Sequence, residues 1–137
     1  MQKRKDLVPD FIPESLIEHG HMFHFSMSHL QPDSIAWKKE TLLEVIEALA
    51  NHEYAVLGGD VLELSDGCLA YTGDYWDLPD EDVVLWEEYV EYTKEQSVNF
   101  VKDIARRKGG SLRFAIFFIT ERSYKDQMRN FGSIKYR

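Results

Sequence analysis

The first stretch of helical periodicity lies between residues 35 and 50, where apolar residues recur about every 3.6 positions. Asp33–Ser34 precedes it and supplies side chains that can cap free helix amides. Trp37 is expected to anchor the first turn of this helix. Its predicted buried stripe is Leu42, Val45, Ile46 and Leu49.

A second, longer helix is predicted from Val83 or Val84 to Lys108, with acidic residues toward its start and basic residues at its end. Gly109–Gly110 is expected to stop it. The small Ser97 within its apolar stripe predicts close approach of another backbone. That stripe comprises Trp86, Val90, Thr93, Ser97, Phe100 and Ile104, widened by Val101.

Between the two helices the pattern changes to short apolar runs, which predict a β-hairpin over Tyr54–Trp76. Asp66–Gly67 is the predicted turn, because both residues tolerate a positive φ. Gly58–Gly59 is the other candidate turn. We favour a bulge or a close approach of neighbouring groups there, because glycines inside strands usually mark such places.

After the second helix, Leu112–Thr120 is almost continuously apolar and predicts a central strand covered on both faces. A short helix is predicted within Val8–Ile17. The basic segment 121–137 predicts a short helix over Tyr124–Asn130 and an edge strand over Ser133–Tyr136. The fold class expected is α+β, with two principal helices on a small, mainly antiparallel sheet of three or four strands.

Composition narrows the class of protein. The 137 residues are expected to form a single domain over 1–137, in which residues 1–33 are the least interpretable part. The single cysteine, Cys68, excludes an internal disulfide and is expected to pack as a small core residue. With no leader or long apolar run, a cytoplasmic protein without a membrane segment is expected.

Charge is distributed unevenly around a net value of -8. Residues 74–95 contain one basic and nine acidic residues, whereas residues 102–137 contain ten basic and three acidic residues. The acidic part could steer a basic partner, although an ordinary solvated surface explains the same pattern equally well.

Four histidines between His19 and His29 raise the possibility of a metal site. His19 and His21 would share one face of a strand, and His24 or His29 would close the site. The spacing matches no zinc signature, and no carboxylate or cysteine lies within the run. A loop whose aromatic residues cover an edge of the core is the preferred interpretation, and no metal or other cofactor is expected.

The run AVLGGDVLEL, with a helix before it and a Tyr-Trp pair and a long tyrosine-rich helix after it, resembles the bacterial immunity proteins of polymorphic toxin systems. The similarity is to the Immunity protein 40 family and covers about Leu42–Phe118. The resemblance implies a cytoplasmic α+β protein that is made beside a toxin and neutralises it by binding. It brings no catalytic residues.

An inhibitor of this kind needs a complementary surface, and the segment Thr72–Asp82, expected to be an acidic loop, offers one. Tyr75 and Trp76 in it are either pinned into the core or exposed to a partner, two interpretations of equal weight. The predicted partner-binding residues are Asp74, Tyr75, Trp76, Asp77, Asp80, Asp82, Glu87 and Glu91.

Asp60 completes a structural motif with Gly58 and Gly59. We expect its carboxylate to accept hydrogen bonds from neighbouring amides and to fix the bulge, rather than to contact the toxin directly.

Two other functions stay open. One is a metal-dependent enzyme that uses the His19–His29 loop with Asp60 or Asp77. The other is a nucleic-acid-binding module, which the overall acidity disfavours. Its candidate residues are Arg106, Arg107, Lys108, Arg113, Arg122, Lys125, Arg129, Lys135 and Arg137.

Overall fold

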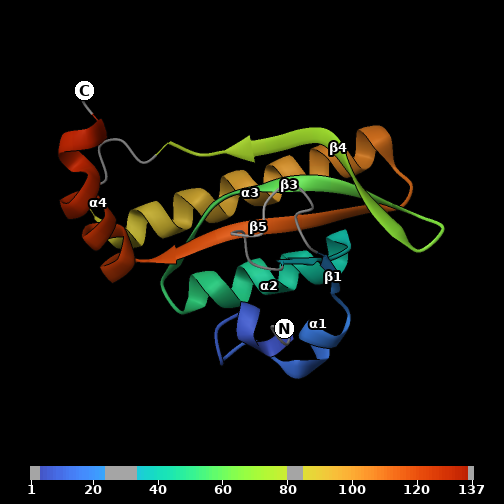
Figure 1. Cartoon of the computed structure of the whole chain (residues 1–137), viewed down its shortest axis with the longest axis horizontal. Coiled ribbons are helices and arrows are strands. Elements are labelled where there is room, and N and C mark those ends of the chain that lie inside the picture. The colour runs from blue at the N-terminus through green and yellow to red at the C-terminus, as the bar shows by residue number, and fades with distance from the viewer. Residues whose placement is uncertain (1–3, 24–33, 80–84, 136–137) are drawn as a thin grey trace.

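The computed structural model describes residues 4–23, 34–79 and 85–135, with side chains up to residue 128. A three-stranded antiparallel sheet has the strand order β4-β3-β5, and β1 and β2 form a separate two-stranded antiparallel ribbon (Figure 1). The fold class is α+β, as predicted. The elements in chain order are η1 (Arg4–Leu7), α1 (Glu14–Glu18), β1 (His21–Phe23), β2 (Ser34–Ala36), α2 (Lys39–Asn51), β3 (Tyr54–Ser65), β4 (Cys68–Asp77), α3 (Trp86–Lys108), β5 (Leu112–Thr120) and α4 (Glu121–Lys135).

The predicted hairpin is formed by β3 and β4. Its turn lies at Asp66 and Gly67, whose φ angles are 50° and 79°. Two successive positive φ values match the right-handed twist of the flanking strands, which explains why an Asp–Gly pair is found here. The turn fixes the register, and that register decides which side chains of β4 face the core.

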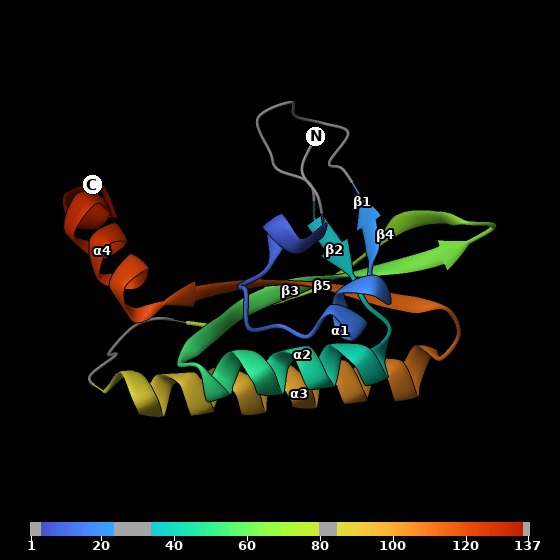
Figure 2. The same ribbon diagram turned by 90° about the horizontal axis from the view of Figure 1, so that it is seen from below.

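The sheet separates two layers. Helices α2 and α3 lie side by side against one face, here called the inner face (Figure 2). The β1–β2 ribbon covers part of the opposite, outer face, where Ala36 and Phe23 pack with Leu62 and Ala115. Helix α4 leaves the end of β5 on the outer side as well.

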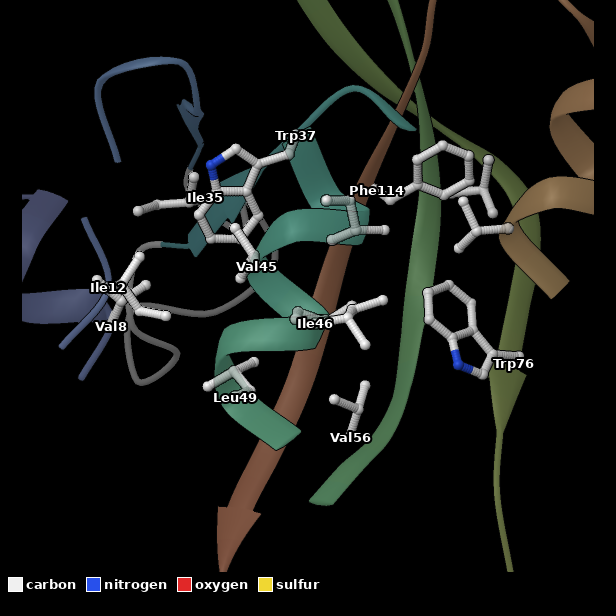
Figure 3. Packing of buried hydrophobic residues seen from close by; sticks show 14 of the residues in the cluster. Val8, Ile12, Ile35, Trp37, Val45, Ile46, Leu49, Val56, Trp76 and Phe114 are labelled. Atoms are coloured by element: carbon white, nitrogen blue, oxygen red, sulfur yellow. The ribbon is translucent and has the colours of Figure 1, made fainter. Parts of the chain in front are cut away.

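The main core fills the space between the inner face and the two helices and continues past α2 to Val8 and Ile12 of the N-terminal segment (Figure 3). Leu42, Val45, Ile46 and Leu49 are all buried, which confirms the predicted stripe of α2. Helix α3 contributes Val101 and Ile104, and its C-terminal cap is Gly109 with a φ of 60°. Both principal helices therefore pack as their apolar periodicity predicts.

The start of the first helix was predicted wrongly. Ser34–Ala36 forms a strand, the helix begins at Lys39, and Asp33 lies outside the described residues. Trp37 makes an isolated bridge in which its amide donates to the Phe114 carbonyl at 2.9 Å and its carbonyl accepts from the Phe114 amide at 2.7 Å. Its backbone groups are thus used by the sheet and are not available to a helix.

The position of β5 also differs from the prediction. The central strand is β3, and among the described residues the other edge of β5 carries only the bridge to Trp37. Its outer face is covered at Ala115 but open at Phe117, whose side chain is 49% exposed. The prediction from the continuous apolar run therefore overestimated how much of this strand is buried.

The two ends of the chain differ in how well they match the prediction. The short helix predicted within Val8–Ile17 forms as α1, which ends one residue later at Glu18, and a 3₁₀ turn at Arg4–Leu7 precedes it. Helix α4 reaches Lys135, so residues 133–135 are helical rather than an edge strand. The Thr120 hydroxyl accepts from the Ser123 amide at 3.1 Å and caps this helix as soon as β5 ends.

Candidate functional site

The predicted acidic loop is largely a strand, because β4 extends to Asp77 and pairs with β3 over Gly58–Asp60. Side chains of a strand alternate between faces. Trp76 is therefore buried at 7% exposure, whereas Tyr75 points outward and is 66% exposed. Of the two residues in the aromatic pair, Trp76 is thus pinned into the core and Tyr75 is exposed.

Trp76 is held firmly on the inner face. Its Nε1 donates to the Ser97 hydroxyl at 3.0 Å, and its ring packs against Phe100 with centroids 4.9 Å apart. A β-carbon at Gly59 would overlap the Trp76 ring, and one at Gly58 would overlap the Trp76 carbonyl. The two glycines thus permit β4 to lie close to β3. The small Ser97 of α3 accepts the hydrogen bond from Trp76 and so links β4 to the helix.

Asp74 is turned toward α3 and is engaged there. Its carboxylate forms an ion pair with Lys108 at 2.5 Å. The hydrogen bond from Lys108 is the main cause that lowers the Asp74 pKa. Burial opposes it, and the charge of Lys108, a hydrogen bond with Thr72 and the charge of Arg107 lower the pKa further. The charge of this carboxylate is therefore already balanced by Lys108 within the folded protein.

Asp60 lies on the outer face, directly opposite Tyr75 in the β3–β4 register. Burial raises the pKa of its carboxyl group. In the described part of the chain, its carboxylate accepts no hydrogen bond and joins no ion pair, so the expected bonds from neighbouring amides are not formed. The register of β3 with β5 shifts between Val56 and Gly58, next to the predicted bulge. A second bulge lies in β4 between the partners of Asp60 and Leu62, where the Thr72 hydroxyl donates to the Val61 carbonyl at 3.0 Å.

The remaining predicted contact residues lie in different parts of the chain. Asp77 is exposed at the end of β4, on the same face as Tyr75. Glu87 and Glu91 are exposed on α3, and the charge of Glu91 acts on Lys94, which binds Glu47 of α2 at 2.7 Å. Asp80 and Asp82 lie outside the described residues.

Two exposed aromatic residues of the outer face were not predicted from the sequence. Tyr71 of β4 is 49% exposed, and Phe117 of β5 faces outward opposite Gly58. Tyr71 lies on the same outer face as Tyr75, four residues away along β4, with a bulge between them. Strict alternation within Leu112–Thr120 signals Phe117, but the continuous apolar run concealed it.

The histidines form no metal centre in the part of the chain that is described, where no three His, Cys, Asp or Glu side chains converge on one point. The His19 ring nitrogen Nδ1 lies 2.5 Å from the Ser15 carbonyl oxygen. Burial, with the nearby charges of Arg113 and Arg4, lowers the His21 pKa. His24 and His29 lie outside the described residues.

Several basic residues proposed for nucleic-acid binding are paired with carboxylates. Arg106 and Arg107 both contact Asp103, at 2.7 and 2.9 Å, and Lys125 contacts Glu121 at 3.2 Å. The side chains of Arg129 and Lys135 are not described, and Arg137 lies outside the described residues. These pairs reduce the positive potential that phosphate binding requires.

Cys68 was expected in the core and is instead exposed beside the hairpin turn. None of the described helices has the length and apolar content that crossing a membrane requires.

Comparison with known proteins gives one match. The model of the Immunity protein 40 family matches residues 26–118, more than half of the chain and the part that contains the hairpin, α2, α3 and most of β5. No curated protein and no solved structure matches the chain.

Proposed function

Since the chain belongs to the Immunity protein 40 family, we propose that it binds a cognate bacterial toxin in the cytoplasm and neutralises it by forming a stoichiometric complex. Membership of the family supports the immunity role and a toxin partner in general. The observation that carries the binding mechanism is the uncovered part of the outer face, where large aromatic side chains stand exposed beside carboxylates.

Exposed aromatic residues on a rigid sheet are suited to binding a protein. Tyr71, Tyr75 and Phe117 each expose about half or more of their surface. Tyrosine combines a large apolar area with a polar end and loses little conformational freedom on binding, which explains its enrichment in binding hot spots. We therefore place the centre of the contact surface at Tyr75 and Asp77.

The acidic balance of the chain supports a basic partner. Its 24 acidic residues exceed its 16 basic residues, and Asp60 and Asp77 both lie on the outer face. Complementary charge raises the rate of association and excludes wrong partners. In this proposal Trp76 and Asp74 support the surface from the inner face, and Glu87 and Glu91 lie on a different side of the molecule.

Co-expression tests the proposal. The gene adjacent to this one is expressed alone and together with this chain, and colony growth is counted. We expect its product to arrest growth alone and to be tolerated with this protein, and a tagged copy to recover it. Toxicity that persists despite soluble expression of this protein would refute the immunity role.

Charge reversal at Asp77 maps the surface, with Glu87→Lys as a matched control on another side of the molecule. We expect protection to fall for Asp77→Lys and to be retained for Glu87→Lys. Equal protection by both variants would exclude this end of β4 as the contact surface.

A further inference from the structure

The outer face carries a compact group of three side chains, here called the Asp60 site: Asp60 of β3 with Tyr71 and Tyr75 of β4. Tyr75 is paired directly with Asp60, and Tyr71 is paired with Leu62, two residues further along β3. Directly paired side chains lie on the same face of a sheet, with β-carbons about 5 Å apart. Both tyrosines consequently share a face with the carboxylate.

A β-bulge makes this arrangement possible. Between the pairs Asp60–Tyr75 and Leu62–Tyr71, β3 advances by two residues while β4 advances by four. Gly73 in the bulge has a φ of 93°, and the Asp74 amide donates to the Thr72 hydroxyl at 3.1 Å. The bulge is therefore stabilised within β4, independently of Asp60. It takes up the two extra residues of β4 and so places Tyr71 opposite Leu62, only two residues along β3 from Asp60.

The carboxylate of Asp60 has no cationic partner in the described part of the chain. Burial raises its pKa, and burial together with the charge of Asp60 raises the pKa of Tyr71 to about 12. Arg113 is on the same face, but its Nη1 donates to the Leu112 carbonyl at 2.9 Å and its charge acts on His21. A partly buried negative charge is thus held beside two aromatic rings.

Both rings are accessible to a partner. Tyr75 is 66% exposed and Tyr71 is 49% exposed, and Tyr71 is also held edge-on against Phe23, with ring centroids 6.2 Å apart. In the view from below, the long helices α2 and α3 lie on the opposite side of the sheet from this group (Figure 2). An aromatic face next to a carboxylate matches the flat, cationic guanidinium group, which stacks and forms charged hydrogen bonds at once.

We propose that the Asp60 site receives a basic side chain of the toxin, an arginine in the first place, with the carboxylate of Asp60 as its ion-pair partner and the rings of Tyr71 and Tyr75 against its flat faces. This inference rests on the proposed function and names the chemistry of the contact. It also gives Asp60 a role in binding in place of the expected role in fixing the bulge.

The test measures the affinity between this protein and the purified product of the adjacent gene by isothermal titration calorimetry. Asp60→Asn removes the charge at nearly constant shape, and Tyr75→Ala removes one ring. Glu63→Gln is the matched control, because it removes one exposed acidic charge from the same strand. We expect Kd to rise about 10- to 100-fold for the first two variants and to stay within about twofold for the control.

Thermal unfolding of the free variants separates binding from folding. Because burial raises the Asp60 pKa, the charged carboxylate is unfavourable in the folded protein near neutral pH. Asp60→Asn should therefore unfold at the same temperature as the wild-type protein or at a higher one. A clear drop in that temperature would contradict the inference, because it would show that Asp60 stabilises the fold.

A double-mutant cycle then identifies the partner side chain. Each exposed arginine or lysine of the toxin is replaced by alanine and measured against both wild-type protein and Asp60→Asn, and one of them should lose its effect in the Asp60→Asn background. Wild-type affinity of Asp60→Asn would overturn this inference while leaving the proposed function intact. Failure of the wild-type protein to bind or protect would refute both.

Discussion

Trp76 and Tyr75 are neighbours in the chain, but we predict opposite consequences of replacing them with alanine. Trp76 is 7% exposed, packs on Phe100 and donates to Ser97, so Trp76→Ala leaves a large cavity. Such a substitution costs about 3–5 kcal/mol of unfolding free energy. Tyr75 is 66% exposed, and its replacement should change the free energy by no more than about 0.5 kcal/mol.

Urea unfolding followed by circular dichroism measures both variants without relying on tryptophan fluorescence. With an m-value of about 2 kcal/mol per molar urea, Trp76→Ala should lower the midpoint by about 1.5–2.5 M. Trp76→Phe keeps most of the ring and should lie between the two. Similar midpoints for Trp76→Ala and Tyr75→Ala would refute the reasoning, because they would mean that β4 is not paired in this register.

Three further predictions use the same unfolding assay. Ser97→Ala leaves the Trp76 indole N–H buried without a partner and should cost about 1–3 kcal/mol; no change would contradict that role for Ser97. Gly59→Ala forces a β-carbon against the Trp76 ring and should cost at least about 1–3 kcal/mol, and a neutral result would mean that the two strands are further apart. Because Lys108 lowers the Asp74 pKa, the pair stabilises the fold at neutral pH, and this contribution is lost as pH falls through the folded pKa. The stability difference between wild type and Lys108→Met should accordingly shrink from neutral pH to about pH 3, and a constant difference would exclude the ion pair as its source.

Local patterns were sufficient for the parts of the fold that short-range chemistry determines. The turn at Asp66–Gly67 and the stop at Gly109 follow from residues that tolerate positive φ. The buried stripes of α2 and α3 follow from helical periodicity.

Long-range pairing explains the main errors. Ser34 resembles a helix cap, but β2 pairs with β1, and the Trp37 backbone pairs with Phe114, far along the chain. Gly73, Asp74 and Asp77 have the composition of a loop, yet pairing with β3 overrides that local preference.

The composition of the candidate site depends on which residues of β4 face outward, and the sequence alone does not determine this. Whether Tyr75 or Trp76 faces outward changes with a shift of one residue in register. The approach of Tyr71 to Asp60 requires the bulge at Gly73 as well. Asp60 itself stood out in the sequence, but its lack of a partner among the described residues is visible only in the structure.

Titration of the toxin with this protein tests the central claim most directly. Increasing amounts of the protein are mixed with a fixed amount of the purified product of the adjacent gene, and residual toxicity and complex mass are measured at each ratio. Stoichiometric inhibition predicts that toxicity falls in proportion to added protein, ends at a fixed molar ratio, and is accompanied by one complex of the corresponding mass. Loss of toxicity at a small fraction of that ratio, without a stable complex, would contradict the account and indicate a catalytic mechanism.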